Sequence, residues 1–343
     1  MKLKKFFSVV FWELQNFFQV DLNYLLKGGA WWALGRAISF LGSFLILFFF
    51  ARFATKEVYG TYQYVLSTAA ILSLLLLPGL DSALVRSVAQ GKERTFFLIE
   101  KAKIRWGIVT FFVFFAVSLW YFFHQNFQLG ASFFFAGLLF PFLSIFSLYF
   151  SFWYGKKRFD IQNVYFVLHN LLGASIFCLF IYLKPQIPFV VFAFYFSFTL
   201  SSFVFWFKTR KKIQKQSFED KEAISFGKHL TLMSLPGTIS QQIDNILLWQ
   251  FWGPEVLAIY TFALRLVQRI QEVIPFAQLA LPKMAEKDFS HPRAKSSIFN
   301  KFLKLFLFSI PFTLGLILIL PAVFKIFFPR YLQSVFWAQL IST

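Results

Sequence analysis

Apolar residues in this chain come in runs of roughly 20, the length that spans a membrane as a helix, and short polar segments separate the runs. An α-helix rises about 1.5 Å per residue, so each run crosses the roughly 30 Å hydrocarbon core of a bilayer. The pattern therefore predicts an all-α membrane protein with nine complete spans and the start of a tenth near Tyr331. The nine are predicted at residues 28–53, 62–85, 106–123, 130–153, 161–183, 189–207, 230–252, 256–281 and 302–324.

Composition supports lipid as the solvent for most of the chain. Hydrophobic residues occupy 58% of the 343 positions, charged residues occupy only 14%, and the mean hydropathy is +0.63. A soluble domain of ordinary composition carries about 25% charged residues. A soluble globular fold is therefore excluded for the greater part of the sequence.

The positions of the cationic residues predict the orientation. The net charge is +19, and Lys and Arg accumulate on the cytoplasmic side of membrane proteins. Here they concentrate in the even-numbered connections, at residues 86–105, 156–158, 208–228 and 283–295, and the odd-numbered connections are nearly bare. The pattern predicts a multi-pass protein of the cytoplasmic membrane with its N-terminus in the cytoplasm. Because the cations do not gather on one face, it also argues against nucleic-acid binding.

The segments outside the spans complete the predicted organisation. Phe7, Phe11 and Phe18 share one helical face beside three lysines, which is typical of an amphipathic helix that lies on a membrane surface and binds anionic lipid. The predicted parts are a surface segment (1–27), a six-helix lobe (28–207), a basic cytoplasmic linker (208–228) and an incomplete second lobe (229–343).

An internal repeat relates the two predicted lobes. A shift of 198 residues aligns the first predicted span with the seventh, and the second with the eighth, without a gap. The aligned identities are Gly29 with Gly227, Glu57 with Glu255, Val58 with Val256, and Tyr62 with Tyr260. Six spans separate the copies, so both insert in the same sense. Parallel repeats of this kind are related by an axis along the membrane normal and enclose a central cavity.

Three stretches carry a likeness to a known family. They are residues 26–30 (LKGGA), 51–62 (ARFATKEVYGTY) and 78–86 (PGLDSALVR). Here, and more weakly along nearly all of the chain, the sequence resembles the O-antigen and lipid-linked oligosaccharide flippases of the multidrug/oligosaccharidyl-lipid/polysaccharide exporter superfamily. The resemblance implies two pseudo-symmetric six-helix lobes that rock around a central cavity. Because members carry about twelve to fourteen spans, it also implies a fragment or truncated product whose second lobe is incomplete.

Cationic side chains within the predicted spans are the candidate substrate ligands. An ionisable group at the bilayer centre costs at least about 2.5 to 3.5 kcal/mol, so each one needs a reason. Arg265, Arg269 and Glu272 share one face of the eighth predicted span, Gln268 lies nearby, and Arg36 lies two turns into the first. Since guanidinium groups bind phosphate oxygens, these arginines, with Gln268, are predicted to hold a polyprenyl-pyrophosphate-linked sugar. Two alternatives stay open: Arg36 snorkels to the surface, and Arg269 pairs with Glu272 in a structural cluster.

A polar patch lies in the middle of the seventh predicted span. Its members are Gln241, Gln242, Asp244 and Asn245, which only an inward face can satisfy in lipid. Asp244 is predicted either to pair with an arginine of the eighth span or to bind a coupling proton or cation. Pro236 and Gly237 open the same span and are a candidate hinge for the rocking motion.

Further polar or helix-breaking residues have structural interpretations. Pro78 and Gly79 predict a break in the second span. His169 and Asn170 are predicted to form interhelical hydrogen bonds. Asp81 and Arg86 are predicted to have a structural role at a cytoplasmic helix end, and the single cysteine, Cys178, to be a small core residue.

The sequence shows no enzyme signature: no Gly-rich phosphate loop, no paired metal-ligand motif and no clustered Ser, His and Asp. It therefore predicts no enzyme, no metal and no cofactor. The leading hypothesis is a secondary, ATP-independent flippase for a lipid-linked oligosaccharide or polysaccharide precursor. One alternative is a cation-coupled multidrug exporter of the same superfamily, which the surplus of Arg over acidic groups in the spans disfavours. Another is a non-transporting membrane scaffold that works with other polysaccharide assembly proteins.

Overall fold

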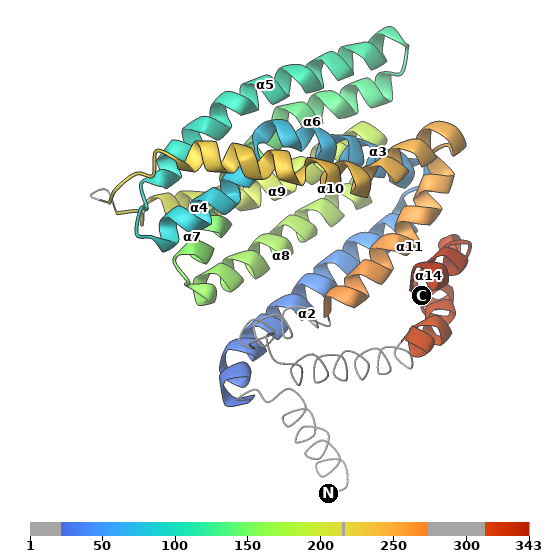
Figure 1. Ribbon diagram of the computed structural model, residues 1–343. Helices are drawn as coiled ribbons and strands as arrows, with labels where there is room; N and C mark the ends of the chain where they lie inside the picture. Colours follow the sequence, from blue (N-terminus) through green and yellow to red (C-terminus); the bar gives the residue numbers. More distant parts are fainter. Residues whose placement is uncertain (1–21, 215–216, 274–312, 343) are drawn as a thin grey trace, which may run out of the picture.

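The computed structural model describes residues 22–214, 217–273 and 313–342, and all secondary structure in these ranges is helical (Figure 1). The helices are α2 (Leu22–Phe53), α3 (Lys56–Leu72), α4 (Gly79–Ala89), α5 (Thr95–Phe123), α6 (Phe127–Phe146), α7 (Leu148–Gly155), α8 (Phe159–Leu183), α9 (Ile187–Arg210), α10 (Ala223–Trp252), α11 (Pro254–Val273) and α14 (Ser334–Ser342). Short 3-10 turns cover Ser73–Leu76 and Pro329–Tyr331, and a further apolar helix covers Thr313–Phe327. The predicted all-α class is confirmed for these residues.

Within the described ranges, four helical segments are long and apolar enough to cross a bilayer. They are Thr95–Phe123, Phe127–Gly155, Phe159–Leu183 and Ile187–Arg210, and the bent pair Lys56–Leu76 with Gly79–Ala89 is a fifth candidate. α5 leaves an apolar face exposed, with Ile108 at 57% and Phe112 at 60%, which suits lipid better than water. The chain is a multi-pass membrane protein, whereas the count of nine spans and the two-lobe symmetry stay predictions.

A break in the second predicted span bends the chain by 49°. The 3-10 turn after α3 ends at Leu77, whose φ of 53° lies in the left-handed region, and Pro78 precedes α4. Pro78 has no N–H to donate to a continuing helix, so the helix cannot run on unchanged. The prediction of a break at Pro78-Gly79 is confirmed.

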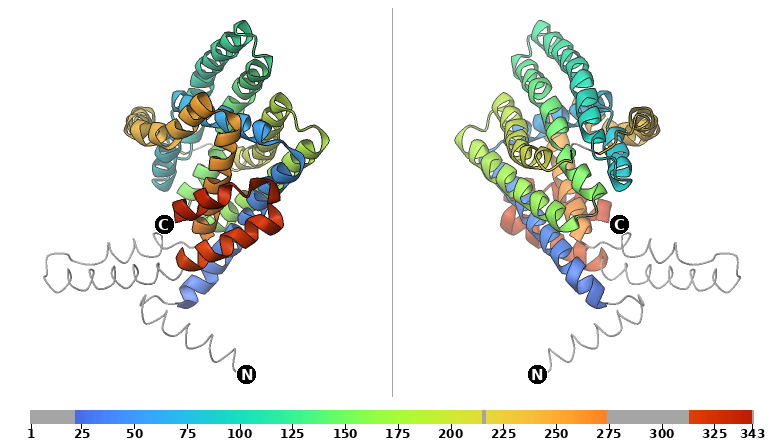
Figure 2. Two further views of the ribbon diagram at one scale, coloured as in Figure 1. Left: turned by 90° about the vertical axis from the view of Figure 1, so that its right-hand side faces the viewer. Right: turned by 90° about the vertical axis from the view of Figure 1, so that its left-hand side faces the viewer.

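The packing of the helices brings distant segments together. α5 and α6 pair at one edge of the bundle, and α14 lies beside α11 toward the opposite edge (Figures 1 and 2). Between them α6 packs on α9, α9 on α8, and α8 on α2, which also contacts α11. The rings of Phe50, Tyr59, Tyr62 and Phe177 pack edge to face or tilted in the interior of this arrangement, and Cys178 is buried as predicted.

Close contacts join the broken span to α10 at its break and to α11 near its start. A Cβ atom added at Gly79 would overlap the carbonyl oxygen of Gly227 on α10, and one added at Gly60 would overlap that of Pro254 at the start of α11. Backbone stands in the way in both places, so only glycine fits there. Residues far apart in sequence are therefore held tightly together near the start of the span and at its break.

Ion pairs gather three of the predicted cytoplasmic connections at one end of the bundle. Lys156, after α7, pairs with Glu93, in the turn before α5. Lys92, in that same turn, lies 3.5 Å from a carboxylate oxygen of Asp220, in the segment between α9 and α10. The charge pattern requires these even-numbered connections to share one side, and the structure places them together. Which side of the membrane they occupy stays a prediction.

Two helix starts differ from expectation. α5 starts at Thr95 rather than near residue 106, so Lys103 lies inside the helix and is fully buried, although the sequence assigned it to a connection. α10 starts at Ala223 rather than near residue 230. Charged residues near these helix starts were assigned to the polar connections, so the starts were predicted too late in the sequence. Lys103 and Glu100 are paired in the fold, with Asp81 and Arg210 respectively, and pairing is what lets a helix bury such groups.

Candidate functional site

A cavity of about 310 Å³ lies between α2, α3, α8, α9 and α11. Its wall is largely apolar and aromatic, and the polar lining residues are Ser43, Tyr59, Tyr62, Gln63, Asn170, Arg265 and Arg269. A mainly apolar cavity with a few convergent polar groups is the usual form of a ligand-binding site. We therefore take this cavity as the candidate functional site.

Two arginines make the cavity cationic. Arg265 and Arg269 lie one turn apart on α11 and both line the cavity, as their i, i+4 spacing allows. Both side chains are partly buried. Among the described residues, the lining includes no aspartate or glutamate. The cavity thus presents positive charge with no carboxylate in its wall, and a substrate-binding role for the arginines stays a prediction.

Two buried polar atoms in the same wall form no hydrogen bond of good geometry with a described residue, although they lie near each other and the Tyr59 hydroxyl also lies near Thr261. They are Tyr59 Oη and Gln63 Oε1, which belong to side chains one turn apart on α3. Tyr59 is 1% exposed and Gln63 is 5% exposed. An unpaired buried polar atom costs about 1 to 3 kcal/mol, so it marks a place where a ligand or water completes the bonding. Sequence reasoning missed both residues, although a glutamine within an apolar span was a usable signal.

The other predicted substrate ligands are placed differently. Gln268 is partly buried on α11 but does not line the cavity. Arg36 belongs to α2 and Glu272 to α11, and both side chains lie outside the part of the chain whose side chains the structure describes. The pairing of Arg269 with Glu272 therefore stays an open alternative.

The predicted polar patch on α10 does not form a single inward surface. Asn245 is buried and donates a 2.9 Å hydrogen bond from Nδ2 to Ser67 Oγ on α3. Gln242 is partly buried, whereas Gln241 and Asp244 are exposed. Within the described ranges, Asp244 forms no ion pair with the arginines of α11. Its other predicted role, binding a coupling proton or cation, stays a prediction.

Pro236 and Gly237 lie within α10 rather than at its start. The helix continues through Pro236, and both residues are exposed. A Cβ atom added at Gly237 would meet no other atom within 4 Å. Nothing therefore packs against this point, and the hinge role stays a prediction.

The two polar residues predicted to bridge helices differ in their partners. His169 Nδ1 on α8 lies 2.8 Å from Ser201 Oγ on α9, so that prediction is confirmed. Asn170 instead donates a 2.8 Å hydrogen bond to Phe166 O of its own helix, so the prediction of an interhelical bond is wrong for it. A short amide side chain can satisfy itself on the preceding turn without reaching a neighbouring helix.

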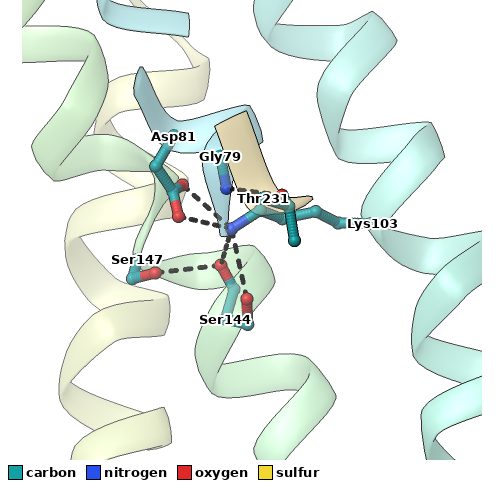
Figure 3. Close-up of polar contacts among 6 residues, drawn as sticks. All are labelled: Gly79, Asp81, Lys103, Ser144, Ser147 and Thr231. Carbon is teal, nitrogen blue, oxygen red and sulfur yellow. Dashed lines mark hydrogen bonds and ion pairs between the residues drawn. The ribbon is translucent and has the colours of Figure 1, made fainter. Parts of the chain in front are cut away.

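An ion pair joins the start of α4, in the broken span, to the buried Lys103 of α5 (Figure 3). Lys103 Nζ on α5 lies 2.9 Å from both carboxylate oxygens of Asp81 on α4, and it also donates to Ser144 Oγ at 3.1 Å. Next to it, Gly79 N donates a 3.0 Å hydrogen bond to Thr231 Oγ1 of α10. The cluster fixes the start of α4 against three other helices, α5, α6 and α10. Sequence reasoning expected a structural role for Asp81 but missed Lys103 as its partner.

Asp220 lies at the end of the bundle where the ion pairs join the predicted cytoplasmic connections. Its Oδ2 accepts a 2.9 Å hydrogen bond from Ser87 Oγ, and its backbone N–H donates to Thr95 Oγ1 at 2.8 Å. Burial favours the protonated acid, but the Ser87 hydrogen bond and the charge of Lys92 outweigh it, so the pKa of Asp220 lies below its ordinary value. The ionised carboxylate ties the segment before α10 to α4, and the backbone N–H of Asp220 ties it to α5.

A comparison with protein families identifies the family of this chain. A family model described as polysaccharide biosynthesis protein matches residues 25–287, which include the broken span, the cavity arginines and the Lys103–Asp81 pair. The chain belongs to this family. No curated protein and no solved structure in the comparisons matches it.

Members of the polysaccharide biosynthesis protein family are membrane transporters rather than enzymes, and they include the flippases that the sequence resembles. The family resemblance is therefore confirmed. This family member is a multi-pass membrane protein of polysaccharide biosynthesis, and its cationic cavity is the feature that any account of transport must explain.

Proposed function

We propose that this family member is a secondary flippase that moves a lipid-linked oligosaccharide or polysaccharide precursor across the cytoplasmic membrane, with its N-terminus in the cytoplasm. The observation that carries the proposal is the cavity of about 310 Å³ in which Arg265 and Arg269 share a wall with the buried polar side chains of Tyr59 and Gln63. An anionic head enters this cavity because the arginines replace part of the hydration that it loses.

The polar groups of the cavity match a sugar phosphate. Guanidinium groups only donate hydrogen bonds, and a phosphate oxygen is an acceptor that fits Arg265 in this wall. Gln63 Oε1 only accepts, so it needs a donor such as a sugar hydroxyl. Tyr59 Oη serves either partner. A ligand that carries phosphate and sugar together offers acceptors to the guanidinium groups and hydroxyl groups to Gln63 and Tyr59, whereas an inorganic anion offers acceptors only.

The size of the cavity sets what part of the substrate it holds. About 310 Å³ is at the low end of ligand pockets, which range over about 300 to 1,000 Å³. The phosphates and the first sugar therefore occupy it, and the remainder of the oligosaccharide enters as the helices move apart.

The charge of the site disfavours a multidrug exporter for cations. The described lining holds two arginines and no carboxylate. Asp244, the acidic residue predicted for cation coupling, is exposed on α10 instead. A cationic drug would meet repulsion in this cavity, whereas a pyrophosphate meets attraction.

Binding of a polyprenyl diphosphate to the purified protein in nanodiscs tests the proposal. Hydrogen bonds to charged groups contribute about 1.5 to 3 kcal/mol each, and a tenfold change in Kd is about 1.4 kcal/mol. We expect Arg265→Gln to weaken binding about 10-fold to 100-fold on those values. Arg105→Gln, at an exposed position on α5, is the matched control and should bind as the wild type does.

The same assay separates the alternatives. Equal binding by the wild type and by the Arg265→Gln, Arg269→Gln double variant removes these residues from the mechanism. Preferential binding of a cationic amphiphile favours the exporter, and binding of neither ligand favours the scaffold. In cells, the double variant should abolish surface polysaccharide export at normal expression.

A further inference from the structure

A second hollow lies on the outer side of the contact between α2 and α8. It has a volume of about 490 Å³, and its wall is almost wholly apolar. α2 contributes Leu45 and Phe53, and α8 contributes Leu179 and Tyr182. Leu45 is 48% exposed and Leu179 is 56% exposed, so the hollow opens to the surroundings of the bundle. We call it the α2/α8 groove.

The α2/α8 groove follows the two helices over about half of a bilayer. Gly42 and Ala174 line one end, and the rings of Phe53 and Tyr182, 5.1 Å apart, lie at the other. The stretch from Gly42 to Phe53 is about 16 Å long at a rise of about 1.5 Å per residue. That length is close to half of the roughly 30 Å hydrocarbon core. The groove thus offers an apolar track from mid-membrane to one membrane face.

The groove and the cationic cavity adjoin each other. Of the residues that the structure describes, Gly42 and Ala174 alone line both of them. A Cβ atom added at Gly42 would lie 3.8 Å from the Cβ of Ala174, in ordinary van der Waals contact. Two of the smallest residues therefore form the shared part of the partition between an apolar track and a site for an anion.

We infer that the α2/α8 groove binds the hydrocarbon tail of the lipid whose anionic head occupies the cationic cavity. The inference rests on the proposed function. Withdrawing a tail from an apolar medium costs about 0.8 kcal/mol for each CH₂ group, so the tail stays out of the polar site while the head is inside. Such a lipid must leave the cavity sideways, and Gly42 with Ala174 offers the least side-chain obstruction where the two hollows meet.

The continuity of the two hollows argues for the substrate tail rather than a bulk phospholipid. A bulk phospholipid chain needs only an apolar surface, which many exposed faces of this bundle provide. A substrate tail needs an apolar surface that begins at the wall of the anion site, and the α2/α8 groove begins there. The cationic cavity and apolar groove together match one amphiphile with an anionic head.

Photo-crosslinking of the protein in nanodiscs tests the inference. The probe is a polyprenyl diphosphate with a diazirine in its tail, and mass spectrometry locates the labelled peptides. We expect labels on α2 and α8 along the groove. Leu179→Trp, which fills the groove, should lose these labels. Leu172→Trp is the matched control, because Leu172 is 46% exposed on the same helix but outside the groove, and it should keep them.

A second variant tests the part of the groove that lies next to the cavity. Ser175→Leu places a larger side chain in the groove beside this partition, so it should lose the groove labels while inorganic pyrophosphate still binds the cavity, which Ser175 does not line. Retention of pyrophosphate binding shows that each variant is folded and that the anion site is intact.

The outcomes separate the inference from the proposed function. If the probe binds with dependence on Arg265 but labels other helices, or labels the groove equally in Leu179→Trp, the groove inference is overturned and the proposed function stands. If a diazirine phosphatidylglycerol labels the groove and unlabelled polyprenyl diphosphate does not compete, the groove holds bulk phospholipid and the inference is overturned. If neither the probe nor pyrophosphate binds, the proposed function and the inference both fail.

Discussion

Removing Asp81 and removing Lys103 should affect stability unequally, although each change breaks the same ion pair. The side chain of Lys103 is 1% exposed, whereas that of Asp81 is 34% exposed. Asp81→Asn leaves an enclosed ammonium group with neutral partners only. Lys103→Met leaves a carboxylate that water can still reach. The two variants therefore differ in whether a charge is left buried without compensation.

The expected magnitudes follow from this asymmetry. Removing one partner of a buried ion pair costs about 3 to 5 kcal/mol when the remaining charge stays enclosed. Asparagine retains one acceptor, and Ser144 offers its Oγ at 3.1 Å and its carbonyl oxygen at 3.3 Å. We therefore expect the lower value, about 3 kcal/mol, for Asp81→Asn. Replacing a buried charge by an apolar chain of similar volume is often neutral, so Lys103→Met should lie within about 1 kcal/mol of the wild type.

Unfolding in mixed micelles, titrated with SDS and followed by tryptophan fluorescence, measures these differences. The wild type, the two single variants and the double variant form one thermodynamic cycle. The midpoint should fall for Asp81→Asn and return toward the wild-type value in the double variant. An equal loss in both single variants, or a double variant as unstable as Asp81→Asn, would refute the buried-charge reasoning.

Three further predictions concern packing, hydrogen bonding and pH. Gly60→Ala should destabilise the protein strongly, because the added Cβ overlaps the carbonyl oxygen of Pro254. Gly237→Ala should stabilise the protein by about 0.5 to 1 kcal/mol, since its Cβ meets no described atom within 4 Å and alanine favours a helix interior. A Gly60→Ala variant more stable than Gly237→Ala in the SDS titration would contradict the packing. Unchanged transport in Gly237→Ala would count against a hinge there. Asn245→Ala and Ser67→Ala should each lower the free energy of unfolding by about 1 kcal/mol, and the double variant should lower it no more than either, because the two residues share one hydrogen bond. Additive losses would show that no such bond exists. Asp220→Asn should lower the melting temperature at neutral pH, because the pKa of Asp220 is depressed in the folded protein. This difference from the wild type should be full above about pH 4 and disappear as the pH falls through the folded pKa, so a difference that persists in strong acid would contradict the assignment.

The apolar pattern was sufficient to predict the helices that are surrounded by lipid and by neighbouring apolar helices. Residues 161–183 and 189–207 were predicted as spans, and the structure has helices at Phe159–Leu183 and Ile187–Arg210. A chain in hydrocarbon must satisfy its backbone groups internally, so a long apolar run leaves helix as the structure open to it. Sequence alone therefore locates such helices to within a few residues.

The starts of α5 and α10 could not be found in the same way. Lys103 reads as part of a polar connection until its partner is known, and that partner, Asp81, belongs to another helix. Glu100 is likewise paired with Arg210, which lies far along the chain. Whether a charge ends a helix or is enclosed within one depends on tertiary contacts that periodicity does not contain.

The candidate site was predictable only in part. The spacing of Arg265 and Arg269 was enough to place them on one face of a helix, and both line the cavity. Tyr59 and Gln63 belong to the site because their polar side chains are buried in its wall, which is a property of the packed structure. Asp244 was expected to face inward but is exposed, because α10 turns Asn245 toward α3 instead.

Movement of a fluorescent, pyrophosphate-linked sugar lipid between the leaflets of proteoliposomes tests the central claim most directly. The account predicts faster movement with the wild type and with Arg105→Gln than in protein-free vesicles. It predicts the protein-free rate for the Arg265→Gln, Arg269→Gln double variant. Movement by the double variant at the wild-type rate would contradict the claim that the cationic cavity carries the head of the lipid.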